Sequence, residues 1–299
     1  TMYKKFSNSY YDVRNAYKDL TNHTKLLNSL NKQCNKLLQK IKREFSINSI
    51  KFTMMITQKR KQEILTRIYN SFMDLSSILD LTNEEMKINS SLNIEIVKNL
   101  EDIAAVAQFV PDTRTIKLVI DKKLGGNLAH EWFHYIDKLL GEKYSYNSIS
   151  SDLTYSDFLY DGNRQHQVLI ESIKNIVNKD RDYFRRSLEA DNTYIDWKTN
   201  KIFHSLPKVP KYYALNRELV ARAFEVYVVR LMAKKGINNT FLCDFSNDEF
   251  IVLQNIDGEI QQIRIYPTVT EDERIFICEN MDLFIGKLKE FKFFKEGFE

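Results

Sequence analysis

The amino-acid sequence predicts a predominantly helical α+β fold, for two reasons. Long stretches place apolar residues at helical spacing, whereas strand-like composition is confined to short segments, chiefly residues 92–120. The chain has 299 residues, of which 43% are hydrophobic, and this is enough for one large domain or two smaller ones. We therefore expect a basic helical module in residues 1–90 and, in residues 91–299, a domain that combines helices with a small mixed sheet.

The first expected elements are two helices. Apolar residues recur at helical spacing from Tyr10 to Phe45 and again from Gln58 to Leu79. Residues 1–70 hold 15 Lys and Arg against four Asp and Glu, a net charge of +11 in a chain whose total is +4. This asymmetry suggests contact with a nucleic acid or an acidic partner. The alternative is a solvated helical hairpin whose charges oppose the acidic remainder of the same chain.

Strands are expected next, between Leu92 and Ile120. The segment Arg114–Ile120 has strand composition, and Gly125 and Gly126 then break the pattern before a helix begins. If this strand lies at the edge of the sheet, an extended peptide can pair with it by β-addition. A strand inside an ordinary sheet is the alternative.

The following helix carries the most informative motif, the HExxH of His130, Glu131 and His134. Histidines at i and i+4 project from one helical face about 5–6 Å apart, so both imidazoles can bind one Zn²⁺ while Glu131 acts as general base on a metal-bound water. Five apolar residues flank the motif, as a buried active-site helix requires: Leu128, Ala129, Trp132, Phe133 and Ile136. A surface helix that carries these residues by chance is the alternative.

A catalytic zinc needs a third protein ligand and leaves its fourth position to water. The best source is the helical pattern from Tyr212 to Glu225, which starts just after Pro210. A glutamate in such an apolar helix is costly to bury unless it is paired or bound to metal, so Glu218 and Glu225 are both candidates. Pairing of either carboxylate with Arg222 is the alternative.

The rest of the chain predicts loops around a cleft and a few short elements. Polar or proline-containing stretches at residues 144–161 and 194–211 are typical of loops, with a helix at 168–176 between them. Short strands are expected at 249–253 and 263–266, before a closing helix at 279–291.

The segments Gly125–Asp137 and Glu218–Glu225 resemble the two motifs of the gluzincin metallopeptidases. The resemblance is to the lethal-factor-like branch and to the metallopeptidase-like domains of large polyvalent proteins of phages and mobile elements, and it covers roughly residues 112–285. It implies a zincin-like catalytic domain in residues 91–299. It also implies that His130, His134 and Glu218 are the zinc ligands.

Other site residues follow from the same resemblance. It implies that Tyr213, or its neighbour Tyr212, stabilises the oxyanion. It favours Asp137, seven residues after His130, as a carboxylate that orients a ligand imidazole, whereas spacing alone equally allows a solvated acid. Arg222 and Glu225 are expected beside the ligands, with Arg222 an alternative oxyanion group.

The leading hypothesis is a zinc-dependent endopeptidase that acts on a protein or peptide substrate. The alternative is a nucleic-acid-associated phage or mobile-element protein with a structural or vestigial zinc site. The intact Glu131 favours the enzyme, because a structural zinc site needs no general base and is closed by a fourth protein ligand. No apolar run suggests a membrane span, and three widely separated cysteines fit a reducing compartment, so we expect synthesis in a cytoplasm.

Overall fold

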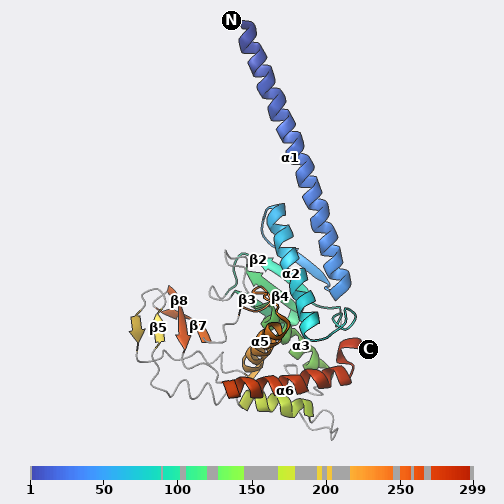
Figure 1. The fold of residues 1–299 in the computed structure, drawn as a ribbon, viewed down its shortest axis with the longest axis vertical. Helices are drawn as coiled ribbons and strands as arrows, with labels where there is room; N and C mark the ends of the chain where they lie inside the picture. Colours follow the sequence, from blue (N-terminus) through green and yellow to red (C-terminus); the bar gives the residue numbers. More distant parts are fainter. Residues whose placement is uncertain are drawn as a thin grey trace.

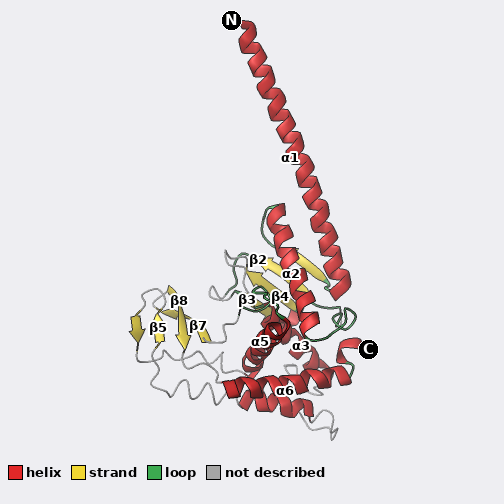
Figure 2. Ribbon diagram, in the orientation of Figure 1, coloured by secondary structure: helices red, strands yellow, loops and turns green. Residues whose placement is uncertain are grey.

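The computed structural model describes the conformation of residues 2–88, 90–101, 106–119, 127–144, 168–178, 194–196, 201–203, 216–244, 250–256, 259–265 and 271–296. Within these ranges helices predominate and the strands form two four-stranded sheets (Figure 2). The predicted α+β, predominantly helical fold class is therefore confirmed. None of the described helices is long and apolar enough to cross a membrane.

The N-terminal helix α1 (Met2–Phe45) is long, and much of it projects from the body of the protein (Figure 1). Thr57 caps the N-terminus of helix α2 (Gln58–Ile78). Two contacts show that α2 runs in the same direction as α1. Cys34 of α1 contacts the carbonyl oxygen of Gln58 at 3.5 Å, and further along both helices the rings of Phe45 and Phe72 stack with centroids 5.2 Å apart. The two helices are therefore parallel, and the helical hairpin considered as the alternative, which requires antiparallel helices, is wrong. Strand β1 (Ser49–Phe52) lies between them in the sequence and brings the chain back to the start of α2.

The first sheet has the strand order β1-β2-β4-β3. Strands β1, β2 (Asn93–Val97) and β4 (Thr115–Val119) are parallel, and β3 (Ala107–Val110) pairs antiparallel with β4. Strand β1 lies before residue 90 and pairs with β2, which lies after it, so this sheet contains strands from both expected domains. The domain boundary at residue 90 stays a prediction.

The strand expected at Arg114–Ile120 corresponds to β4, but its expected place at the edge is wrong. The short helix η1 (Pro111–Thr113) and the left-handed conformation of Arg114, with φ of 48°, reverse the chain between β3 and β4. Strand β3 therefore covers the outer side of β4 and forms that edge of the sheet itself.

Helix α3 (Leu128–Tyr144) packs against β3 and against α5 (Asn216–Lys235). Helix α6 (Glu271–Glu290) packs against α5, with the short α7 (Phe293–Glu296) beside it. The ring of Phe224 on α5 lies 5.0 Å from Phe133 and 5.8 Å from Trp132, both on α3. These side chains belong to one apolar core that also includes the buried faces of α1 and α2. The core fixes the position of α3 relative to α5.

The second sheet is antiparallel, with the order β6-β5-β8-β7. Strands β7 (Phe250–Ile256) and β8 (Glu259–Ile265) lie where strands were expected, and both are longer. Residues 194–211 are not wholly a loop, because they contain β5 (Tyr194–Asp196) and β6 (Lys201–Phe203). Strand β5 pairs with β8, which is distant in the sequence, and β6 pairs with β5.

Four other expectations concern the rest of the chain. The expected helix at 168–176 is present at 168–178, and α6 begins earlier than expected. The loop expected at 144–161 and the turn at Gly125 and Gly126 lie outside the described residues, apart from Tyr144 at the end of α3.

Candidate metal centre

Helix α3 places His130 and His134 one turn apart, with their Nε2 atoms 3.0 Å from each other. The start of the helix is held by two backbone hydrogen bonds, from the N–H of Ala129 to the carbonyl of Leu242 and from the N–H of Glu131 to the carbonyl of Asn127. The apolar side of α3 is buried, so the orientation of the histidine face follows from packing.

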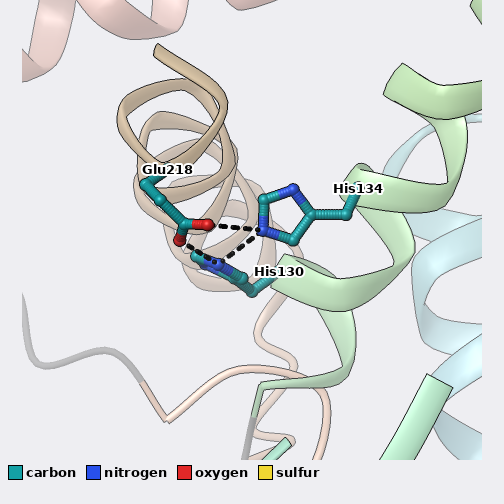
Figure 3. A group of neighbouring side chains, drawn as sticks. All are labelled: His130, His134 and Glu218. Carbon is teal, nitrogen blue, oxygen red and sulfur yellow. Dashed lines mark hydrogen bonds and ion pairs between the residues drawn. The ribbon is translucent and has the colours of Figure 1, made fainter. Parts of the chain in front are cut away.

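Helix α5 brings Glu218 to the two histidines (Figure 3). Its Oε2 atom lies 3.3 Å from Nε2 of His130, and its Oε1 atom lies 3.5 Å from Nε2 of His134. Glu218 is only 3% exposed, although it is a carboxylate in the first turn of the helix. These three residues form a cluster that could hold a metal ion, which we call the metal cluster.

The spacing of the metal cluster fits a zinc ion. A tetrahedral zinc with ligand bonds of about 2.0–2.1 Å holds neighbouring ligand atoms roughly 3.3 Å apart. The two Nε2 atoms are 3.0 Å apart, and they lie 3.3 and 3.5 Å from different carboxylate oxygens of Glu218. With one ligand atom taken from each residue, all three lie within 4.8 Å of one another. Two imidazoles and one carboxylate are also the donor set of many catalytic zinc sites, in which the fourth position stays open.

Glu225 lies behind His130 rather than in the metal cluster. Its Oε2 atom accepts a hydrogen bond from Nδ1 of His130 at 3.0 Å. When Nδ1 carries the proton, the lone pair of Nε2 is free to bind a metal ion in the metal cluster. A carboxylate behind a ligand imidazole fixes the tautomer in this way. Of the two glutamates proposed as the third ligand, Glu218 is thus the one placed beside both histidines.

The buried charges of the site shift each other's pKa values. Burial by itself lowers the pKa of His130, but the Glu225 carboxylate and hydrogen bonds to Glu218 and Glu225 raise it well above 6.5. Burial raises the pKa of Glu218, and hydrogen bonds from His130 and His134 outweigh that effect and lower the pKa. The raised pKa of His130 favours its protonated form in the metal-free site.

Glu131 lies between α3 and the edge strand β3. It is 5% exposed, and its carboxylate accepts a hydrogen bond from the backbone N–H of Phe109. Burial raises the pKa of Glu131, and the charges of His130 and His134 partly offset the rise. A buried carboxylate with a raised pKa, next to the two histidines of the metal cluster, has the properties expected of a general base.

The remaining predicted site residues are less closely defined. Asp137 is 1% exposed on α3, and Arg222 is half-buried on α5. Their predicted roles stay predictions. Tyr213 and Tyr212 lie outside the described residues.

Two residues near the site were not found by sequence reasoning. Arg217 places Nε 3.6 Å from Oε1 of Glu218, with a third of its side chain exposed. Its position directly before Glu218 was the one available signal. Phe109 contributes a backbone N–H, for which side-chain motifs offer no signal.

Residues 207–291 match the family described as large polyvalent protein-associated domain 1. The matched segment contains α5, β7, β8 and α6, and hence Glu218 and Glu225, but it begins after the HExxH helix. It covers less than a third of the chain, and it relates this part to the domains of polyvalent proteins. No curated protein and no solved structure matches the chain.

The metal cluster predicts one zinc equivalent per chain. We expect His134→Ala and Glu218→Gln to lose stoichiometric zinc, whereas Glu225→Gln should weaken zinc binding about 10–100-fold, because it removes only the support of a ligand. The measurement is metal analysis of dialysed protein with competition against a chelator. Glu142→Gln is the control on the same helix, since Glu142 pairs with Arg114 and Lys138. Zinc retained by Glu218→Gln at wild-type affinity would contradict the ligand assignment.

Zinc uptake should release protons. The pKa of His130 is raised above its unfolded value, so this proton stabilises the metal-free fold below that value, and the contribution is lost as the pH rises through the raised pKa. Zinc displaces the proton, so its affinity should fall as the pH falls. Calorimetric titrations in two buffers of different ionisation enthalpy measure the release. The Glu225→Gln variant should release fewer protons on zinc binding. Equal heats in both buffers for the wild type would exclude the coupling between zinc binding and proton release.

Proposed function

We propose that the protein is a zinc-dependent endopeptidase in which Glu131 is the general base. The observation that carries the proposal is the convergence of His130, His134 and Glu218 from two helices, with the buried Glu131 next to them. A structural zinc site would need a fourth protein ligand, and none lies in the metal cluster among the described residues. The resemblance to gluzincin metallopeptidases of phages and mobile elements supports the same reaction.

A zinc ion bound by these three residues would polarise the scissile carbonyl and lower the pKa of its water to about 7. Glu131 then accepts the proton of the attacking water and passes it to the leaving amine. Glu225 keeps His130 in the tautomer that presents Nε2. We assign the oxyanion to Tyr213 or Tyr212, which the resemblance implies, or to Arg222 as the alternative.

The edge strand β3 is the proposed binding site for the substrate backbone. The N–H of Val119 donates to the carbonyl of Val106, so Val106 faces β4. Because backbone groups alternate along a strand, those of Ala107 and Phe109 face the other way, and the N–H of Phe109 reaches Glu131. An extended peptide that pairs with this edge would bring its carbonyls next to Glu131 and the metal cluster.

Glu131→Gln is the decisive variant for catalysis. We expect it to abolish hydrolysis of a peptide library while one zinc remains bound, because the amide cannot accept the proton but keeps the shape of the carboxylate. Cleavage is followed by mass spectrometry, and metal content is measured on the same sample. Glu142→Gln should keep wild-type turnover. Turnover of Glu131→Gln within about tenfold of wild type would remove Glu131 from the mechanism.

The charge of residues 1–70 favours a second candidate function, the binding of nucleic acid. These residues carry a net charge of +11, and Lys18, Lys25, Lys32 and Lys36 are exposed along α1. Such a row of cations can neutralise backbone phosphates without any base contact. This function does not require zinc, so the two proposals can be tested separately.

If α1 binds duplex DNA or RNA, affinity should fall steeply with salt, because each neutralised phosphate releases condensed counterions. We expect the double substitution Lys18→Gln and Lys25→Gln to weaken binding and to reduce the salt slope by about 2. The control is Lys98→Gln with Lys234→Gln, which removes the same charge from exposed positions outside α1. Fluorescence anisotropy over a salt series measures both, and equal slopes for the two variants would reject this surface.

A further inference from the structure

The start of the HExxH helix is capped by a distant turn at residues 239–243, which we call the capping turn. The first N–H groups of a helix have no partner within that helix, and Ala129 is the second residue of α3. Its backbone N–H donates instead to the carbonyl of Leu242 at 2.9 Å, and both residues are fully buried. Because a buried N–H without a partner is costly, this bond holds the backbone directly before His130.

The capping turn also contacts α5. The thiol of Cys243 donates to the carbonyl oxygen of Glu225 at 3.9 Å, and Cys243 is buried. Glu225 is the residue that accepts a hydrogen bond from Nδ1 of His130. One turn therefore contacts the backbone beside His130 on α3 and the backbone of its carboxylate partner on α5.

The residue that gives the capping turn its shape is Asn239. Its Oδ1 atom accepts hydrogen bonds from the backbone N–H groups of Phe241 at 3.1 Å and Leu242 at 2.9 Å. Asparagine favours turns because its side chain can bond to the backbone that follows it. The backbone carbonyl of Asn239 also accepts from the N–H of Cys243 at 3.1 Å. This N–H belongs to the same planar peptide unit as the Leu242 carbonyl, so the bond sets the direction in which that carbonyl points.

Helix α2 fixes the orientation of the Asn239 amide. Its Nδ2 atom donates to Oδ2 of Asp74 at 2.6 Å, and the buried hydroxyl of Ser71 lies 3.4 Å from its Oδ1 atom. An ionised carboxylate only accepts and a backbone N–H only donates, so one orientation of the amide satisfies both sides. The bond to the carboxylate is charge-assisted and is therefore the stronger kind. A chain of contacts thus runs from α2 through Asn239 and Leu242 to the start of α3.

We propose that Asn239 is a positioning residue of the metal cluster. Held by Asp74, it shapes the capping turn, and the capping turn sets His130 of α3 against Glu225 of α5. The proposal rests on the proposed function only in that the metal cluster binds zinc, and not on peptide hydrolysis. It makes α2, which lies in the expected basic helical module, a support of the metal centre.

The variant that tests the proposal is Asn239→Asp in the full chain. It places a second carboxylate against Asp74, and their repulsion should displace the side chain from the turn. We expect zinc affinity to fall about 10–100-fold, as for the loss of other supports of a metal ligand. In the metal-free protein the amide of Ala129 should exchange with solvent at least about tenfold faster, because its hydrogen bond opens locally. Competition with a chelator measures the affinity, and NMR measures the exchange.

The rescue is the double substitution Asn239→Asp with Asp74→Asn. It restores the hydrogen bond with donor and acceptor exchanged, so zinc affinity and the protection of Ala129 should both return towards wild-type values. A general loss of stability would not be repaired by this exchange. Where Asn239→Asp alone does not fold, Asp74→Ala takes its place, since it removes only the anchor of the amide and should change both measurements in the same direction.

The matched control is Lys235→Gln. Lys235 forms a second link from α5 to α2, to Asp80 at 2.8 Å and to the carbonyl of Ser77, and it does not contact the capping turn. Its loss loosens the same pair of helices, so zinc affinity and the exchange of Ala129 should stay at wild-type values.

Three results would each overturn the proposal: wild-type affinity and exchange in Asn239→Asp, no recovery in the double variant, or an equal loss in Lys235→Gln. A wild type that binds no zinc would refute the proposed function by itself. The exchange of Ala129 in the same metal-free proteins would then still decide whether Asn239 positions the start of the HExxH helix.

Discussion

The candidate site depends on the packing of α3 against α5. The residues of the metal cluster come from two helices, and neither helix alone contains all three. The rings of Phe224, Trp132 and Phe133 form the apolar contact that sets the distance between the helices. Since ligand atoms must lie within a few tenths of an ångström of tetrahedral positions, a cavity in this contact would disturb metal binding without touching a ligand.

The same packing confines four ionisable groups in a small volume. His130, Glu131, Glu218 and Glu225 are largely buried, and an isolated buried charge is costly. The two hydrogen-bonded sides of His130 reduce that cost, because a protonated imidazole donates from Nδ1 to Glu225 and from Nε2 to Glu218. In the metal-free fold the buried charges thus partly neutralise one another. A bound metal ion would neutralise the buried carboxylates in the same way.

Local patterns and long-range packing were predicted from the sequence with unequal success. The HExxH spacing alone placed His130 and His134 on one helical face, because four residues make nearly one turn. It could not choose between Glu218 and Glu225, which lie about two turns apart on the same side of α5, so the choice depends on how α5 meets α3. The edge position of β4 was wrong because a reversal at Arg114 adds β3 outside it. Strands β5 and β6 are too short for a local signal without β8.

The separation of the ligands along the chain also determines when the site can form during synthesis. His130 and Glu218 are 88 residues apart, so a ribosome that makes about 5–20 residues per second adds the second roughly 4–18 s after the first. The HExxH helix leaves the ribosome well before the helix that completes its metal cluster. A nascent chain therefore cannot bring the three residues of the metal cluster together until synthesis has passed α5.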